Sequence, residues 1–84
     1  MKLYVLIDEQ YDASYRAVQG AHAVAEYLLR NPGSSWQNHT LVFLKTPCLE
    51  RWTDRLRESD KDFTSFVEPD VGYKITAIAC LDDG

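Results

Sequence analysis

The chain has 84 residues, of which 45% are hydrophobic and 26% are charged, and its formal net charge at pH 7 is −4. This length allows one domain with one core and excludes two, and the composition is that of an ordinary globular protein. The negative charge argues against a protein that binds nucleic acid by simple phosphate neutralisation, because such proteins are normally basic. We therefore expect a single domain over residues 1–84.

The N-terminal residues contain no targeting or membrane signal. Residues 1–8 lack the apolar stretch of about 7–15 residues that secretion requires. The chain has no hydrophobic run long enough to span a membrane. Outside a secretory context, Cys48 and Cys80 are expected to be reduced and buried. These features predict a cytoplasmic protein with no membrane partner.

The first predicted elements are a strand and a long helix. Residues 3–7 form a β-branched apolar run, typical of a strand that is buried on both faces. Asp12 or Ser14 can cap a helix that runs to about Arg30, before the breaker sequence at residues 31–33. At 100° per residue one apolar stripe lies along this helix, and we expect it to face the sheet. The stripe consists of Ala17, Val18, Ala21, Val24, Ala25 and Leu28.

The second half of the chain predicts one more helix and three more strands. Residues 40–45 are expected to form a central strand, and Thr46 and Pro47 to open a helix that ends near residues 59–61. Trp52 lies on the apolar face of this helix, whereas Trp36 lies in a loop. Residues 63–68 and 74–81 are expected to form an antiparallel hairpin, since the link between them is short. The prediction is an α/β domain of order β-α-β-α-β-β, with a four-stranded mixed sheet covered by helices and an undetermined strand order.

Four polar side chains share one edge of the first predicted helix. Tyr15, Gln19, His22 and Glu26 fall within a sector of about 60° on the helical wheel. One interpretation is a polar rim over a cleft, with His22 contacting a ligand or Glu26. The other is that His22 is a boundary residue bonded to a nearby carbonyl group, with Glu26 in water. The spacing alone leaves both open.

A second candidate lies in the link between the last two strands. Pro69 fixes the backbone there and Gly72 permits positive φ, so the turn can present Asp70. Glu68 and Asp70 could act as acid and base if their pKa values differed enough. The alternative is ordinary turn chemistry, because Asp favours turns by bonding to backbone N–H groups.

Several familiar signatures of cofactor and metal chemistry do not occur in the sequence. It contains no Gly-rich phosphate loop and no Gly-x-Ser-x-Gly nucleophile motif. The His and Cys residues lack the spacing of metal ligands. We expect neither a metal nor a cofactor.

The helix motif Gln19-Gly20-Ala21-His22-Ala23, directly after a first strand, resembles the type II peptidyl-tRNA hydrolase family. The flanking residues 15–18 and 24–25, the order of the following elements, the Asp70-Val71-Gly72 segment and Thr76 fit the same pattern. The resemblance covers nearly the whole chain as a shortened version of the fold. It implies metal-independent hydrolysis of the ester between a peptide and the tRNA 3′ end.

By position, the resemblance implies catalytic roles for His22, Asp70 and Thr76. It implies that Tyr15, Arg16, Gln19 and Glu26 bind the substrate, which is tRNA or peptidyl-tRNA. Asp70 would orient or activate water, while His22 and Thr76 would position the ester. The family has lysines in the loop before this helix, but residues 9–16 contain only one basic residue, Arg16. A non-catalytic binding module that keeps the fold is therefore the alternative, and a homodimer is a third possibility.

Overall fold

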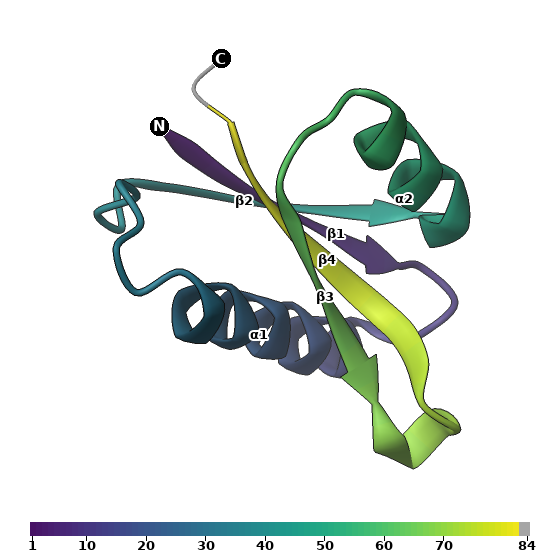
Figure 1. The fold of residues 1–84 in the computed structure, drawn as a ribbon. Coiled ribbons are helices and arrows are strands. Elements are labelled where there is room, and N and C mark those ends of the chain that lie inside the picture. Colours follow the sequence, from purple (N-terminus) through teal and green to yellow (C-terminus); the bar gives the residue numbers. More distant parts are fainter. Residues whose placement is uncertain (83–84) are drawn as a thin grey trace.

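The chain folds into two helices and a four-stranded sheet (Figure 1). The computed structural model describes residues 1–82, so the last two residues of the predicted domain 1–84 lie outside the described part. The elements are β1 (Lys2–Asp8), α1 (Ala13–Arg30), β2 (Thr40–Thr46), α2 (Leu49–Glu58), β3 (Phe63–Glu68), the short 3₁₀ helix η1 (Pro69–Val71) and β4 (Lys74–Asp82). The predicted order β-α-β-α-β-β is confirmed, with η1 added in the hairpin.

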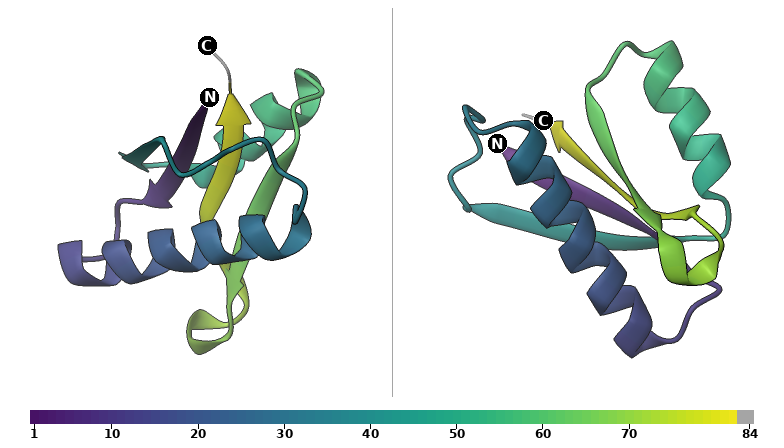
Figure 2. Two further views of the ribbon diagram at one scale, coloured as in Figure 1. Left: turned by 90° about the vertical axis from the view of Figure 1, so that its left-hand side faces the viewer. Right: turned by 60° about the horizontal axis from the view of Figure 1, so that its bottom comes forward.

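The sheet is mixed and has the strand order β2-β1-β4-β3. β1 and β2 are parallel, and β4 is antiparallel to both of its neighbours, β1 and β3. One helix covers each face of the sheet (Figure 2). The predicted α/β architecture is therefore confirmed, and so is the antiparallel hairpin.

Each face of the sheet has its own hydrophobic cluster. Under α1 the cluster contains β1 and β4 side chains, together with Ala23, Tyr27 and Trp36. Under α2 the cluster is smaller and is built around Leu49, Leu56 and Ile78. Because alternate strand residues point to opposite faces, β1 contributes to both clusters, as the predicted two-sided burial requires.

The prediction that residues 40–45 form a central strand is wrong. β2 is an edge strand paired only with β1, and most of its residues are exposed on both faces. A continuous apolar run normally indicates burial on both faces, which is why the sequence favoured the centre of the sheet. In the described part of the chain, the side chains of Leu41, Phe43 and Leu44 remain more than 40% exposed.

The predicted sheet-facing stripe of α1 is also wrong, except for Val24, which packs against the core. The buried residues of this helix are Gln19, Gly20, Ala23 and Tyr27, so the helix is rotated relative to the prediction. Burial of the two polar side chains is possible because each has a partner. Gln19 bonds to Thr76, and the Tyr27 phenol lies 2.5 Å from the Ser34 hydroxyl. The apolar residues assigned to the core, such as Val18 and Leu28, are instead about half exposed.

Three further expectations need correction around α2 and the loops. Thr46 remains in β2, and Cys48 takes the N-cap position of α2 without a side-chain cap bond, so Pro47 precedes the helix. Trp52 is 37% exposed, with Arg55 above its ring, whereas Trp36 is only 6% exposed and donates to the Thr40 carbonyl oxygen. Of the two thiols, Cys80 is buried as expected and Cys48 is exposed.

Candidate functional site

A β-bulge in β4 directs Thr76 toward α1. In the ladder between β3 and β4, Phe66 pairs with Ala77 and Val67 pairs with Ile75, so Thr76 is the extra residue. A bulge interrupts the strict alternation of side chains and commonly re-aims one of them. The Thr76 hydroxyl thereby reaches the Gln19 side-chain oxygen on α1 and bonds to it.

The Gln19–Thr76 pair is completely buried. Both side chains are 0% exposed, although they lie 57 positions apart in the sequence. The Gln19 amide nitrogen is buried as well and has no hydrogen-bond partner within residues 1–82. Since Thr76 is closed off from solvent, this hydroxyl holds α1 against β4 and can influence a surface site only through Gln19.

Tyr15 lies one helical turn before Gln19 and meets the carboxylates at the end of β3. Desolvation raises the pKa of Tyr15, and the charges of Glu68 and Asp70 and a hydrogen bond to Glu68 raise it further. Desolvation and the charges of Asp8 and Glu68 also raise the pKa of Tyr11. Both phenols therefore stay protonated at neutral pH in a negative local potential. Glu68 is only 7% exposed, which places a buried carboxylate behind them.

Tyr11 and Tyr15 form one wall of an open hollow of about 400 Å³. Their rings are tilted against each other, with centroids 4.9 Å apart. Gln10 and Asp12, the chain neighbours of Tyr11, also line the hollow, and so do Asp70 and Val71 from η1. Gly72 ends η1 at φ 80°, the left-handed conformation that glycine adopts without strain. We call this hollow the tyrosine hollow.

His22 lies on the same edge of α1 and stacks on β3. Its ring is parallel to the Phe66 ring within 6°, and the ring centroids are 4.5 Å apart. The imidazole remains exposed at the surface. The stacking holds the ring against β3 and leaves its polar edge able to contact a ligand.

Three of the predicted substrate-binding residues do not line the tyrosine hollow: Gln19 is fully buried, and Glu26 and Arg16 lie elsewhere on α1. Glu26 forms an ion pair with Arg30 at 2.9 Å on the helix surface. Arg16 donates to the Tyr11 carbonyl oxygen at 2.6 Å and lines a different hollow, on the β2 side of α1. The structure thus joins Gln19 to Thr76 by a hydrogen bond and places Tyr15 and Asp70 in the lining of one hollow. Arg16 lines the separate hollow beside β2.

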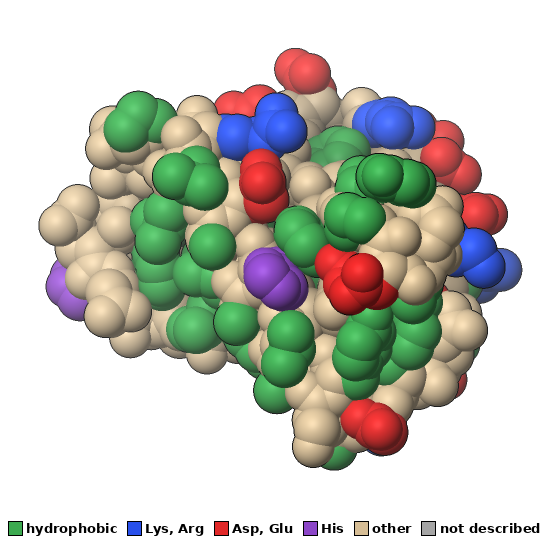
Figure 3. All heavy atoms as spheres, turned by 90° about the horizontal axis from the view of Figure 1, so that it is seen from below, with side chains coloured by type: hydrophobic (Ala, Val, Ile, Leu, Met, Phe, Trp, Pro, Cys, Tyr) green, Lys and Arg blue, Asp and Glu red, His purple; other side chains and the backbone are tan. Residues whose placement is uncertain are grey.

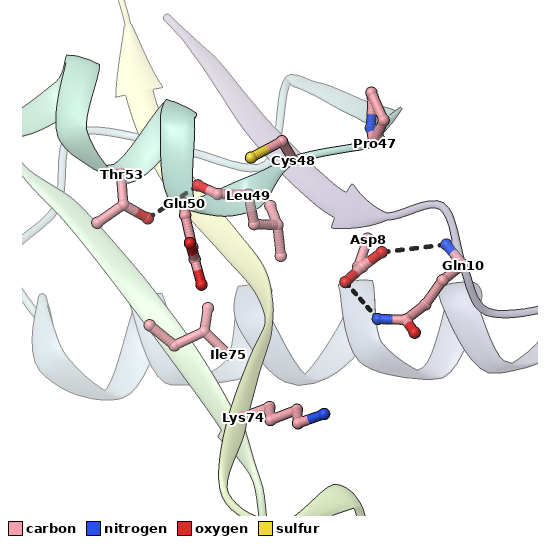
Figure 4. Close-up of a pocket in the computed structure, with 9 residues that line it drawn as sticks. All are labelled: Asp8, Gln10, Pro47, Cys48, Leu49, Glu50, Thr53, Lys74 and Ile75. Atoms are coloured by element: carbon pink, nitrogen blue, oxygen red, sulfur yellow. Dashed lines mark hydrogen bonds between the residues drawn. The ribbon is translucent and has the colours of Figure 1, made fainter.

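A second hollow of about 430 Å³ lies beyond the carboxyl ends of β1 and β2 (Figure 4). The connections after these parallel strands lead to opposite faces of the sheet, an arrangement that commonly forms a ligand crevice. Asp8 is bonded there to Gln10, and Cys48, Glu50 and Lys74 also line the hollow. Sequence reasoning missed it because the strand order was not known.

The sequence did not fully predict the roles of two residues of the site, Glu68 and Tyr11. Glu68 was considered only as one of two carboxylates in a turn, and Tyr11 not at all. Alternation along β3 could have identified Glu68, because it shares a face with Phe66. Tyr11 lies in an irregular loop, for which no periodicity exists.

The described residues contain neither a cluster of three metal-ligating side chains nor a helix that could span a membrane. Within residues 1–82, no three His, Cys, Asp or Glu side chains gather closely enough to hold a metal ion. None of the helices in that range has the length and hydropathy needed to cross a membrane. A scan against protein-family models finds no match to this chain, and a search of curated proteins finds no similar one.

Proposed function

We propose that the chain is a type II peptidyl-tRNA hydrolase-like domain that cleaves the ester between a peptide and the tRNA 3′ end. The observation that carries the proposal is the convergence of the motif residues at one edge of α1. Gln19 from the helix motif bonds to Thr76 from β4, and Tyr15 lies beside Asp70 of the Asp-x-Gly segment. A cytoplasmic location, close to the translation machinery, belongs to the same proposal.

In this proposal Asp70 activates the attacking water. The exposed carboxylate accepts a proton from water as the water oxygen bonds to the ester carbonyl carbon. The bond between that carbon and the ribose oxygen then breaks, and the proton passes to the ribose oxygen. The products are the free peptide and a tRNA with its 3′ hydroxyl restored. The reaction needs neither a metal nor a redox partner.

The other residues position the substrate. The Tyr11 and Tyr15 rings offer a surface on which the terminal base of the tRNA can stack. Glu68 fixes the Tyr15 phenol, and the Gln19–Thr76 bond fixes the helix turn that carries Tyr15 and His22. His22 contacts the ester or the neighbouring ribose from its stacked position on Phe66. Thr76 acts as a positioning residue, because it is fully buried.

A second candidate is a binding module without hydrolytic activity, and the charge around the tyrosine hollow favours it. Asp12 and Asp70 line the hollow, and Asp8 and Glu68 act on its tyrosines. Arg16, the one basic residue at positions 9–16, lies in α1 and lines a different hollow. Each missing phosphate contact weakens nucleic-acid binding and reduces its dependence on salt. Under this candidate an uncharged or cationic ligand occupies the same hollow and no ester is cleaved.

A turnover assay separates the two candidates. Purified protein is incubated with N-acetylaminoacyl-tRNA at low salt, and release of the labelled amino acid is followed for the wild type, His22→Ala and His39→Ala. Hydrolysis predicts release that falls at least about 10-fold in His22→Ala, the low side of what positioned groups contribute. His39→Ala is the matched control, because His39 is an exposed histidine outside the site. If folded wild-type protein released no labelled amino acid, the binding module would be the remaining candidate.

A further inference from the structure

The outer side of α1 is apolar and uncovered. Beyond the buried stripe, exposed hydrophobic residues continue around the helix toward β2; they are Ala17, Val18, Ala21, Ala25, Leu28 and Leu29. Leu29 is 77% exposed and Val18 is 50% exposed. Seen from outside α1, hydrophobic side chains spread across much of this face (Figure 3). A surface helix normally confines its apolar residues to the stripe that faces the core, so an exposed apolar area of this extent is unusual.

An apolar groove runs beside this helix. α1 packs mainly over β1, β4 and β3 and reaches β2 where Gly20 meets the Phe43 ring, so much of the same face of β2 remains exposed next to it. Leu41 and Phe43 of β2 are 44% and 41% exposed there. A hollow of about 360 Å³ between the start of α1 and the end of β2 forms one end of the groove, with Arg16 and Lys45 in its wall. The exposed side of α1 and this groove together form the α1–β2 surface.

From this arrangement we infer that the α1–β2 surface is the interface of a two-fold symmetric homodimer. The exposed side of α1 forms a ridge, and the surface over β2 forms a groove directly beside it. A two-fold rotation makes these features match, because α1 of each copy fits into the groove of the other copy. In the dimer the two α1 helices lie side by side and antiparallel. Val18 and Leu29 then cover Leu41 and Phe43 of the other copy. The alanines at positions 17, 21 and 25 allow the helices to approach closely.

The charges at the groove favour a second copy of α1 over other occupants. α1 runs opposite to the parallel strands β1 and β2 that it connects. A second, antiparallel α1 lying over β2 therefore has its C-terminal end above the end of β2, beside Arg16 and Lys45. The carbonyl groups at that helix end carry negative partial charge, which cations stabilise, and the charge of Arg30 in the last turn is offset by its ion pair with Glu26. The antiparallel helix dipoles also attract each other.

The available area lies just below the range of specific interfaces and fits a weak, reversible dimer. A helix of 18 residues is about 27 Å long, and helix plus groove are about 20 Å wide, so the face covers roughly 500 Å². Specific interfaces bury about 600–1,000 Å² of accessible surface per partner. We therefore expect a dissociation constant in the range of about 1–100 µM. Tyr15 and the tyrosine hollow lie on the β3 side of α1 and stay open in the dimer, whereas His22, one helical turn after Val18, borders the α1–β2 surface.

Sedimentation velocity over about 5–500 µM protein tests the inference. The wild type is expected to shift from monomer to dimer over this range. Val18→Glu buries a charge in the interface and should raise the dissociation constant at least about 10-fold. Val67→Glu is the matched control, because Val67 is also about half exposed but lies on β3, outside the α1–β2 surface. Circular dichroism verifies that both variants fold.

Two results would overturn the inference. The first is a wild type that stays monomeric at the highest concentration, because the surface would then await a different partner. The second is a dimer that Val18→Glu leaves intact, because its interface would then lie elsewhere, for example along the free edge of β2. Neither result bears on ester hydrolysis, which the turnover assay measures separately.

Discussion

At the scale of single residues, the Gln19–Thr76 hydrogen bond connects the helix motif to the last strand. Both side chains are buried, so the bond competes with no water and orients α1 over β4. Removing only one partner leaves the other polar group buried without a hydrogen bond, which destabilises the fold. Replacing both partners with apolar groups of similar shape costs much less stability. In a double-mutant cycle, the variant that lacks both polar groups should therefore be more stable than the sum of the two single substitutions predicts.

We predict that Gln19→Leu destabilises the fold by about 1–3 kcal/mol, because the Thr76 hydroxyl loses its partner. In the double variant Gln19→Leu/Thr76→Val, most of this loss should be recovered, since both polar groups and the unpaired Gln19 amide nitrogen are gone. Urea unfolding of the wild type, the two single variants and the double variant measures the coupling. Additive effects of the two substitutions would show that the bond contributes nothing to stability.

The raised pKa of Tyr15 predicts that the folded state loses stability at alkaline pH. Desolvation and nearby carboxylates raise the pKa of Tyr15 above that of the unfolded chain, so the folded state holds the phenol proton more tightly. The resulting stabilisation is complete below about pH 10 and is lost as the pH rises further. Glu68→Gln removes one charge and should lower the pKa of Tyr15. Ultraviolet titration of both proteins measures it, and an unchanged Tyr15 titration in Glu68→Gln would contradict the proposed contact.

Residue-level prediction from sequence succeeded where a motif has a fixed spacing. The sequence grouped Tyr15, Gln19 and His22 on one helix edge, and the structure places Gln19 and Tyr15 against β4 and Glu68. It did not reveal that Thr76 is fully buried, because that follows from a bulge, which periodicity does not indicate. Nor did it show that Arg16 turns toward the Tyr11 carbonyl oxygen.

At the scale of elements, the packing of α1 depends on a small residue. A Cβ atom at Gly20 would lie 2.5 Å from the Phe43 ring and 3.0 Å from Ile7 Cδ1. This contact sets how closely the helix approaches β1 and the inner side of β2. The helix wheel predicted a sheet-facing stripe of alanine, valine and leucine, but Gly20 and Ala23 allow the closest approach, and they define the buried side.

We predict that Gly20→Val destabilises the domain by about 1–3 kcal/mol, because the larger side chain forces Phe43 and Ile7 apart. Gly33→Val is the matched control, since nothing lies within 4 Å of a Cβ atom at that position. Thermal unfolding of the three proteins provides the comparison. Equal midpoints for Gly20→Val and the wild type would mean that α1 does not pack closely at this point.

The order of elements was predictable because each has strong local signals. The breaker residues after Arg30, the cap at Asp12 and the short final link determine the helix end, the helix start and the hairpin. Strand order was not predictable, since it depends on contacts between distant segments. For that reason β2 was assigned to the centre of the sheet, although its apolar side chains lie at an edge.

At the scale of the whole molecule, charge and hydrophobic surface lie on different sides of α1. Tyr15 meets the carboxylates of the hairpin on the β3 side, and on the side toward β2 the helix continues into the apolar α1–β2 surface. A small domain buries a modest core, so covering this surface by dimerisation would also stabilise the fold. The site and the proposed interface can therefore be tested independently.

The measurement that tests the central proposal most directly is the turnover of N-acetylaminoacyl-tRNA by Asp70→Asn. Asp54→Asn is the matched control, because it changes the same charge at an exposed position on α2, which covers the other face of the sheet. Our account predicts that Asp70→Asn lowers kcat/KM by about 10²–10⁴-fold, while Asp54→Asn resembles the wild type. Undiminished turnover in Asp70→Asn would contradict the account and exclude this carboxylate as the group that activates water.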